Sequence, residues 1–345
     1  MAEEKEITIY DIARHLSISA TTVSRGLKDH PAINKNTRKK IKEAAKKLGY
    51  RTNTFASSLR SKKTHTIGII VPRLNSYFMS SVLAGMEDAA SNEGYNLIIS
   101  QSLESSEKEV ANAHTMFLKR VDGLLVSLAY DTENINHFEP FIKRKIPVVF
   151  FDRIYPNSDS TGVIIDNYKA AYNAVNHLVE QGCKRIVHLG GNLLRNVYSE
   201  RLRGYKDALK DHKIPFENKL VHISRLNDEA GIEAANFILK QKNNLPDGVF
   251  AANDTAAVYC MMKLMENGIK IPGDIAFVGF NNDPISNIIE PKLSSINYSG
   301  YDIGHTAVSN LINHLRGISN IKTTNRIILR SDLIIRSPSL KNKNL

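Results

Sequence analysis

Two hydrophobic patterns divide the chain. In residues 8 to 50, apolar positions recur at helical spacing in three short stretches separated by polar turns. This pattern predicts helices from Tyr10 to Leu16, Ala20 to Leu27 and Thr37 to Leu48, with Thr8 and Ser19 as caps of the first two. Two helices joined by a tight turn and braced by a third form a helix-turn-helix.

From residue 66 onward, short apolar runs alternate with amphipathic stretches. Such alternation predicts parallel sheets with helices on both faces, and the number of runs indicates two sheets and therefore two lobes. Folds of this kind bind ligands in a cleft at the carboxyl ends of their strands. The predicted strands are 67–71, 96–100, 123–126, 148–151, 186–189, 248–252 and 276–279, and the predicted helices include 78–92, 170–181 and 255–267.

Composition and charge separate the same two regions. A chain of 345 residues with 42% hydrophobic side chains is long enough for two or three domains with buried cores. Residues 1 to 65 carry a net charge of +9, whereas the other 280 residues carry only +2. A small, folded, basic module favours contact with phosphate groups. The N-terminal helical module, called the headpiece below, is therefore expected to bind nucleic acid.

Other classes of protein fit less well. Cys183 and Cys260 lack metal-ligand spacing and are expected to be core thiols in a reducing compartment. The acidic start of the chain and the absence of a long apolar run predict a cytoplasmic protein without a membrane span. A nucleophile elbow, a P-loop, a dinucleotide fingerprint and an HExxH sequence are all missing, so neither catalysis nor a cofactor is expected.

The second predicted helix is the one that would read DNA. Its first turn enters the major groove in helix-turn-helix proteins. Thr21 can hydrogen-bond base edges, Ala20 can contact a thymine methyl, and Arg25 suits guanine or phosphate. Contacts to the DNA backbone are expected from Thr22, Ser24, Asn34, Lys35 and Arg38.

The headpiece resembles that of the lactose-repressor (LacI/GalR) family of transcriptional regulators. The resemblance lies in Thr8-Ile9-Tyr10-Asp11-Ile12-Ala13, Ser19-Ala20-Thr21-Thr22-Val23-Ser24-Arg25, Thr37-Arg38 and Leu48-Gly49-Tyr50. It implies that Thr8, Tyr10 and Ser19 also lie at the DNA. Ser17 stands where the family's turn usually has glycine, so it is expected to adopt that turn at some cost in strain.

Residues 51 to 61 resemble the family's hinge helix, which inserts a leucine into the minor groove. Leu59 matches that leucine, and an apolar wedge of this kind kinks the duplex. Asn53, Ala56 and Arg60 are the other DNA-contacting residues expected here; the alternative is that Leu59 is an ordinary linker or core residue. The expected domains are therefore 1–50 for the headpiece, 51–65 for the hinge and linker, and 66–345 for a two-lobed effector-binding and dimerisation body.

The resemblance continues through the body, in Thr66-Ile67-Gly68-Ile69-Ile70-Val71-Pro72, Val121-Asp122-Gly123-Leu124 and Phe277-Val278-Gly279-Phe280. It implies a body similar to periplasmic sugar-binding proteins, with two doubly wound α/β lobes and a ligand between them. The resemblance places the three chain crossings near 157–162, 284–293 and 323–327. The first lobe would then combine 66–160 with 293–322, and the second would hold 163–290 and the last strand.

Matching the family position by position implies a set of cleft residues suited to a sugar. Asp, Asn and Arg supply paired hydrogen bonds for neighbouring hydroxyls, and an aromatic face suits ring C–H groups. A purine is the alternative, less favoured because Val197 stands where the purine-binding branch has a hydroxyl, while Asn281 replaces a frequent aspartate. The expected effector-binding residues are Tyr77, Phe78, Asp152, Arg153, Arg195, Arg201, Asn253 and Asn281.

The sequence thus predicts a transcriptional regulator, expected to act as a repressor, that binds double-stranded operator DNA. Its affinity for the operator would be controlled by a sugar or sugar derivative bound between the lobes. A homodimer or a tetramer is expected, with two headpieces reading a palindrome. A transport binding protein is the alternative that the body alone would fit, and the basic headpiece counts against it.

Overall fold

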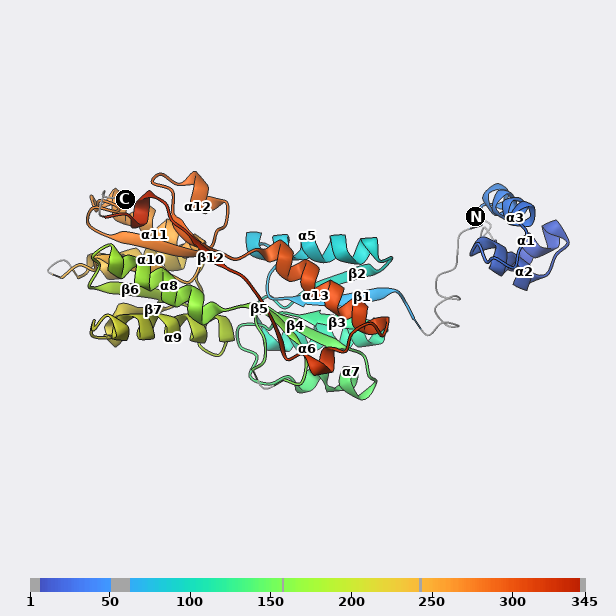
Figure 1. The fold of residues 1–345 in the computed structure, drawn as a ribbon, viewed down its shortest axis with the longest axis horizontal. Helices are drawn as coiled ribbons and strands as arrows, with labels where there is room; N and C mark the ends of the chain where they lie inside the picture. The colour runs from blue at the N-terminus through green and yellow to red at the C-terminus, as the bar shows by residue number, and fades with distance from the viewer. Residues whose placement is uncertain (1–6, 51–62, 157, 242–243, 342–345) are drawn as a thin grey trace, which may run out of the picture. The chain divides into compact units, whose positions relative to one another are not determined.

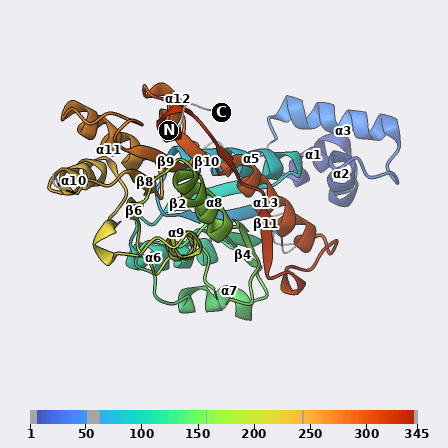
Figure 2. The same cartoon turned by 60° about the vertical axis from the view of Figure 1, so that its left-hand side comes forward.

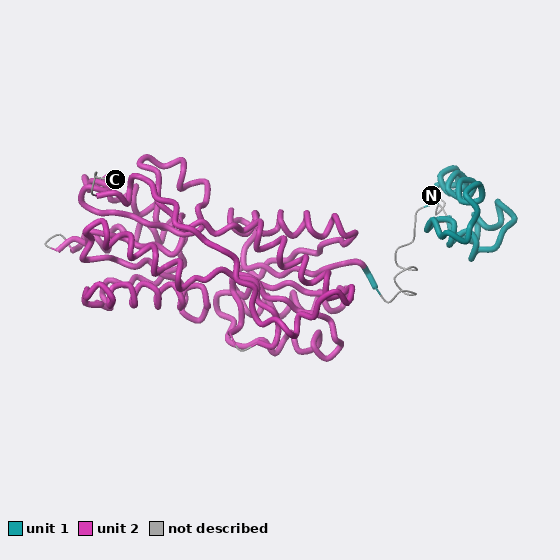
Figure 3. Tube along the Cα trace, in the orientation of Figure 1, with its two compact units in different colours: residues 1–64 teal, residues 65–345 magenta. Residues whose placement is uncertain are grey.

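A computed structural model describes residues 7–50, 63–156, 158–241 and 244–341 of the chain. The chain divides into two compact units, Met1–Thr64 and His65–Leu345, which are coloured separately in Figure 3. In the described residues, no helix is long and apolar enough to cross a membrane.

The first unit holds three helices, α1 (Ile9–Leu16), α2 (Ala20–Leu27) and α3 (Lys35–Leu48). Thr8 and Asp11 form a reciprocal capping box at the start of α1, and Ser19 caps α2 by accepting from the Thr22 N–H. Ser17, between these helices, has a φ of 53°, the left-handed conformation expected for the turn. The predicted helix-turn-helix is therefore confirmed, including its serine in the place of glycine.

The third helix begins earlier than the sequence pattern predicts. It starts at Lys35 rather than Thr37, because the side chain of Asn34 accepts a hydrogen bond from the Asn36 N–H and caps it. Gly49 ends α3 with a φ of 71°. A small core holds the three helices together, in which Ile12, Val23 and Ile41 are completely buried.

The second unit contains two six-stranded sheets, and the first sheet has the order β11-β5-β4-β3-β1-β2 (Figure 1). All its neighbouring strands are parallel. Helices α5 and α13 cover one face, while α6 and α7 cover the other (Figures 1 and 2). The bounds are β1 (Thr66–Val71), α5 (Tyr77–Asn92), β2 (Asn96–Gln101), α6 (Ser106–Leu118), β3 (Gly123–Val126), η1 (Asn136–Phe138), α7 (Glu139–Lys143), β4 (Val148–Phe151), β5 (Gly162–Ile165), α13 (Gly300–Leu315), η3 (Ile321–Thr323) and β11 (Arg326–Leu329).

The second sheet has the order β12-β10-β9-β8-β6-β7, with only β12 antiparallel to its neighbour. Phe250 packs in the core under α8 and α9, whereas Val249 packs under α10 and α11, so the two helix pairs cover opposite faces. The bounds are α8 (Asn167–Glu180), β6 (Ile186–Gly190), α9 (Asn196–Asp211), η2 (Asn218–Leu220), β7 (Val221–Ile223), α10 (Asp228–Leu239), β8 (Gly248–Ala251), α11 (Asp254–Glu266), β9 (Ala276–Asn281), α12 (Ile285–Ile288), β10 (Ser294–Asn297), β12 (Asp332–Ile334) and η4 (Ser337–Ser339).

The lobes are connected at different places from those predicted. Strands β5 and β11 belong to the first sheet and β10 to the second, so the chain crosses after β5, between β10 and α13, and between β11 and β12. The predicted crossings at 157–162, 284–293 and 323–327 are therefore wrong by several residues. A four-residue apolar strand fits either sheet by its pattern, and only hydrogen-bonded pairing decides which sheet it joins.

Candidate functional site

A cleft in the second unit is built where strands of both sheets end. Asp152 and Arg153 follow β4 of the first sheet, and Asn253 and Asn281 lie at the ends of β8 and β9 of the second. The cavity has a volume of about 470 Å³, a size suited to a small molecule. Its lining includes seven of the eight residues predicted to bind an effector: Tyr77, Phe78, Asp152, Arg153, Arg201, Asn253 and Asn281.

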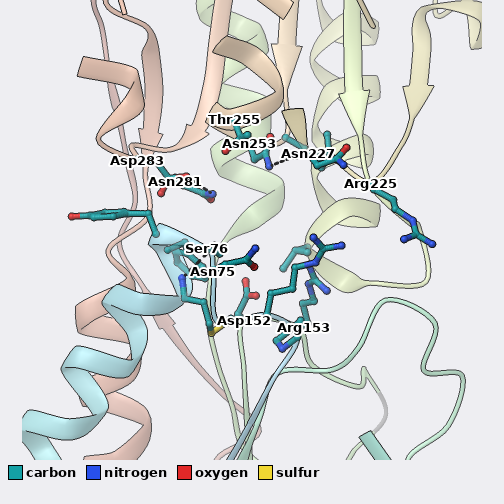
Figure 4. A pocket seen from close by; sticks show the side chains of 18 of the residues that line it. Asn75, Ser76, Asp152, Arg153, Arg225, Asn227, Asn253, Thr255, Asn281 and Asp283 are labelled. Carbon is teal, nitrogen blue, oxygen red and sulfur yellow. Dashed lines mark hydrogen bonds between the residues drawn. The ribbon is translucent and has the colours of Figure 1, made fainter. Parts of the chain in front are cut away.

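Asp152 and Arg153 do not form an ion pair with each other in the described structure. Asp152, in the left-handed region at a φ of 55°, accepts hydrogen bonds from Tyr298 Oη at 3.1 Å and Ser127 Oγ at 3.4 Å. Its burial raises the pKa of its carboxyl. Arg153 donates to Glu104 at 2.7 Å and to the Tyr198 hydroxyl at 3.2 Å. Both side chains are thus anchored by the protein at the floor of the cleft (Figure 4).

Arg201 lines the cleft. Only 3% of this residue is exposed, so it does not belong to an ion pair on the protein surface. Its Nε donates to Asn167 Oδ1 at 2.9 Å and its Nη1 donates to the carbonyl of Ala252 at 2.6 Å. The guanidinium also lies 3.5 Å from the centre of the Phe280 ring, a cation–π contact. Burial lowers the pKa of Arg201, although Tyr198 and Asp152 oppose that shift.

The side chain of Asn253 has a structural part as well as a place in the cleft. Its Oδ1 accepts from the Ala256 N–H at 2.9 Å and caps α11, and its Nδ2 donates to the Leu226 carbonyl at 2.8 Å. Tyr77 is 59% exposed, whereas Phe78 is 8% exposed and packs against the Tyr298 ring in a tilted arrangement. Of this aromatic pair, Tyr77 is therefore the one with a surface available to a ligand.

Arg195 lies outside the cavity lining, unlike the other predicted effector residues. It is 3% exposed, and its Nη2 donates to the carbonyl of Thr132 in the other lobe. In the described part of the chain, its buried Nε has no hydrogen-bond partner. The structure places this arginine in a connection between the lobes.

Other hydrogen bonds join the lobes close to Arg195. Asn192 Nδ2 donates to the Tyr130 carbonyl at 2.7 Å, and the Tyr130 hydroxyl donates to the Ser224 carbonyl at 3.3 Å. Asn196 accepts from the Ile154 N–H at 2.8 Å and donates to the Asp152 carbonyl at 3.1 Å. The cleft residue Asp152 is thus tied directly to the start of α9.

Several lining residues were not predicted from the sequence. They include charged and amide side chains on both walls, some of which Figure 4 labels. A signal was present for one of them, because Asp283 follows two positions after Asn281, at the end of a predicted strand. The additional polar lining residues are Arg73, Asn75, Ser76, Glu104, Arg225, Asn227, Asp228, Thr255 and Asp283.

In the first unit, the predicted base-reading residues lie on the first two turns of α2. Thr21 and Arg25 are exposed and Ala20 is half-buried. Ser19, expected to touch DNA, also bonds Thr22 Oγ1 at 2.8 Å, so the cap fixes a second predicted contact residue. The exposed positions of α2 therefore fit a reading surface, while its caps hold the helix start in place.

Arg38, one of the residues predicted to contact the DNA backbone, also has a structural partner in the headpiece. Arg38 Nη1 donates to the Asp29 carbonyl at 3.1 Å, and Lys42 forms an ion pair with the Asp29 side chain at 2.7 Å. Tyr10 is 67% exposed, whereas Ser24 is half-buried. The hinge residues Asn53, Ala56, Leu59 and Arg60 lie outside the described residues.

Comparison with known proteins gives the same division of the chain. Residues 8–53 match the model of the bacterial regulatory proteins of the lacI family, and residues 175–338 match a periplasmic binding protein-like domain. Catabolite control protein A of Priestia megaterium is 33% identical over 310 residues, which cover 90% of this chain and 92% of that protein. The chain belongs to the lacI family of bacterial regulatory proteins. It is a DNA-binding transcriptional regulator with an effector-binding body.

Further members of the lacI family agree in sequence and fold. The HTH-type transcriptional regulator RegA of Clostridium acetobutylicum is 36% identical over 310 residues, covering 88% of this chain and 91% of that one. The crystal structure of transcription regulator CcpA of Lactococcus lactis has a TM-score of 0.73 at 27% identity and covers 79% of this chain and 98% of its own. The structure of a lac repressor dimer bound to operator has a TM-score of 0.87 at 23% identity. The match covers 97% of this chain and 100% of the repressor chain, and it shows that the fold is the same.

Proposed function

We propose that this lacI-family regulator works as a homodimer whose two headpieces bind a palindromic operator. A sugar or sugar derivative in the cleft would control that affinity. The observation that carries the proposal is the convergence of Tyr77, Asp152, Arg153, Arg201 and Asn281 on one cavity at the ends of both sheets. Amide, carboxylate and guanidinium groups beside an aromatic face suit hydroxyl-rich ligands.

The dimer and the sugar are supported by what related structures contain. The lac repressor structure named above is a dimer on operator DNA. A structure of the regulator CelR in complex with cellobiose has a TM-score of 0.73 at 24% identity and covers 96% of this chain and all of that one. These contents belong to those proteins, and for this chain they make a sugar and a two-fold operator the first candidates to test.

We propose domain limits of 1–50 for the headpiece, 51–65 for a hinge and linker, and 66–345 for the body. On this division Asn53, Ala56, Leu59 and Arg60 would contact DNA, with Leu59 as the wedge in the minor groove. Replacing Leu59 by Ala should then weaken operator binding and reduce DNA bending without changing effector affinity. Unchanged bending in a circular-permutation gel assay would disprove the wedge.

The ligand acts through a difference in affinity between two arrangements of the dimer. Allosteric coupling between two sites is typically about 1–3 kcal/mol, which corresponds to a change of roughly 5- to 150-fold in operator affinity. Two headpieces neutralise many DNA phosphates, so operator affinity should also depend on salt. With roughly 6–10 phosphate contacts, it should fall about 10³- to 10⁵-fold between 50 and 200 mM salt.

The test begins with the full-length protein and a random-sequence duplex library, from which bound DNA is selected and sequenced. A palindromic consensus is expected, and binding to it is then measured by fluorescence anisotropy with and without sugars, sugar phosphates and nucleobases. Thr21→Ala should lower affinity for the consensus more than affinity for random duplex. A protein that binds sugar but shows no salt-dependent duplex affinity would instead be a binding protein without a DNA-binding function.

A further inference from the structure

One carboxyl at the wall of the cleft lacks the partners that buried charged groups normally have. Asp283 lines the cavity and is only 8% exposed. Its backbone N–H donates to Asp254 Oδ2 at 2.7 Å, which fixes its position after β9. The side-chain bond that Asp283 itself receives is a long one, 3.4 Å from Asn281 Nδ2.

Two other buried carboxyls around the cavity accept more hydrogen bonds than Asp283 does. Asp254, completely buried, accepts from Ser295 Oγ at 2.7 Å as well as from the Asp283 N–H. Asp152, across the cavity, accepts from Tyr298 and Ser127. Of these three buried carboxyls, Asp283 is thus the one whose side chain accepts a single, long hydrogen bond within the described part of the chain.

A carboxylate has sites for about four hydrogen bonds, and burying it without donors is costly. That cost agrees with the effect of burial on Asp283, which raises its pKa to about 6. Because the carboxyl faces the cavity, a bound molecule can supply the missing donors. Figure 4 shows Asp283 and Asn281 together on the wall of the second lobe, with Asp152 and Arg153 opposite.

We propose that Asp283 is the specificity-determining carboxylate of the cleft and accepts hydrogen bonds from neighbouring hydroxyl groups of a neutral sugar. This inference rests on the proposed function and assigns its hydroxyl-reading group. Asn281 stands where the family frequently has an aspartate, so its amide lacks the charged acceptor of that aspartate. The fold restores a charged acceptor two residues later on the same wall, and Asn281 Nδ2 helps to orient it.

The same geometry selects against an anionic group at this end of the cleft. A phosphate or carboxylate placed against Asp283 would meet a like charge in a poorly solvated position, which is unfavourable. Two neighbouring hydroxyls can each donate to one carboxylate oxygen. The part of the ligand at this wall is therefore the uncharged diol of a sugar.

The test measures binding of glucose, ribose and cellobiose to the full-length protein by thermal shift, followed by calorimetry with the sugar that gives the largest shift. Asp283→Asn keeps the size of the side chain and removes the charged acceptor. Its affinity for that sugar should fall about 10- to 100-fold, the range expected for losing hydrogen bonds to a charged group. Asp302→Asn, an exposed carboxyl in the first turn of α13, is the matched control and should bind like the wild type.

A series of deoxy analogues of the same sugar separates direct contact from a structural effect. One or two positions should exist at which removing the hydroxyl weakens binding to the wild type but not to Asp283→Asn. The sugar-free variant should melt at or above the wild-type temperature near pH 8, because a poorly paired buried charge has been removed.

Each outcome is decisive. Equal sugar affinity of wild type and Asp283→Asn overturns the inference and leaves the proposed function standing. Deoxy penalties that are the same in both proteins, or a sugar-free variant that melts well below the wild type, assign Asp283 to holding the loop and overturn it too. A wild-type protein that responds to none of these sugars overturns both the inference and the sugar effector of the proposed function.

Discussion

At the scale of single residues, burial decides which polar groups of the cleft are fixed and which are available. Arg201 and Asn253 use their donors and acceptors largely on the protein itself. Asp283 does not, and Tyr77 presents an exposed ring. A cleft that combines anchored groups with a few available ones is preorganised, so less conformational entropy is lost when a ligand binds.

The raised pKa of Asp283 predicts a pH-dependent response to sugar. In the sugar-free protein the pKa lies near 6, above the ordinary value of 3.8, so stability that is present below pH 3.8 is lost as the pH rises through 6. A sugar that donates to the carboxylate offsets this loss. The sugar-induced rise in Tm should therefore be larger near pH 7.5 than near pH 5, as measured by differential scanning fluorimetry.

The control for this prediction has to separate the titration of Asp283 from the titration of neighbouring carboxyl groups. Asp254 faces it from α11 with a pKa that burial also raises well above the ordinary value, and Arg336 lies near Asp254 and bonds Asn282. Asp283→Asn should remove most of the pH dependence of the sugar-induced shift. A dependence that persists unchanged in that variant would belong to Asp254 or Asp152.

In the headpiece, Arg25 and Arg38 are expected to behave differently on substitution. Arg25 is exposed on α2, whereas Arg38 donates to the Asp29 carbonyl. Arg25→Ala should weaken consensus binding by about 1–3 kcal/mol with little change in Tm. Arg38→Ala should lower the Tm as well, because it removes the tether of the loop after α2. Equal Tm losses in both variants would contradict this distinction.

At the scale of elements, close helix packing positions the wall of the cleft. Helices α5 and α13 approach so closely that a Cβ on Gly85 would lie 2.1 Å from the Tyr301 carbonyl oxygen. The start of α5 carries Tyr77 and Phe78 into the cavity, so the contact between these helices fixes one side of the site. The sequence predicted α5 from its apolar pattern but not this contact.

Gly85→Ala should therefore destabilise the first lobe. The added methyl has to push two backbones apart, and overpacking of this kind costs roughly 1–3 kcal/mol. Thermal unfolding of the full-length protein should show a lower Tm. Gly94→Ala, two residues after the last residue of α5, is an unsuitable control because Gly94 has a φ of 73°. Ser91→Ala, at an exposed position of α5, is the better one, and a Tm loss as large there would refute the packing argument.

At the scale of the whole effector-binding unit, the lobes are held by a small number of hydrogen bonds beside the cleft. Asn192, Arg195 and Asn196 of the second lobe donate to carbonyl groups of the first lobe. Contacts of this kind bias the equilibrium between arrangements of the lobes, and an effector shifts it only by its differential affinity.

Asn192→Ala should reduce the population of the arrangement described here, because it removes the bond to the Tyr130 carbonyl. A sugar that binds this arrangement should then bind several-fold more weakly, although Asn192 does not line the cavity. Small-angle scattering of the sugar-free protein should show a larger radius of gyration for the variant. An unchanged radius together with unchanged sugar affinity would show that this bond does not hold the lobes.

By itself, the sequence determined the helix-turn-helix, the alternating α/β order and the basic charge of the headpiece. These features depend on periodicity, capping residues such as Ser19, and composition, all of which are local. Seven of the predicted cleft residues come together because they lie at or after the ends of parallel strands of two sheets, and the carboxyl ends of both sets of strands border the cleft. The resemblance to a family was needed to choose them among many polar residues.

Tertiary structure alone decided which sheet β5, β10 and β11 join, that Arg195 connects the lobes, and that Asp283 faces the cavity almost without partners. A strand of four apolar residues has no preference for one sheet until it pairs, and the direction of a side chain after a strand depends on the loop that follows. Burial and hydrogen-bond satisfaction are properties of the packed chain, so the available groups of the cleft could be recognised only there.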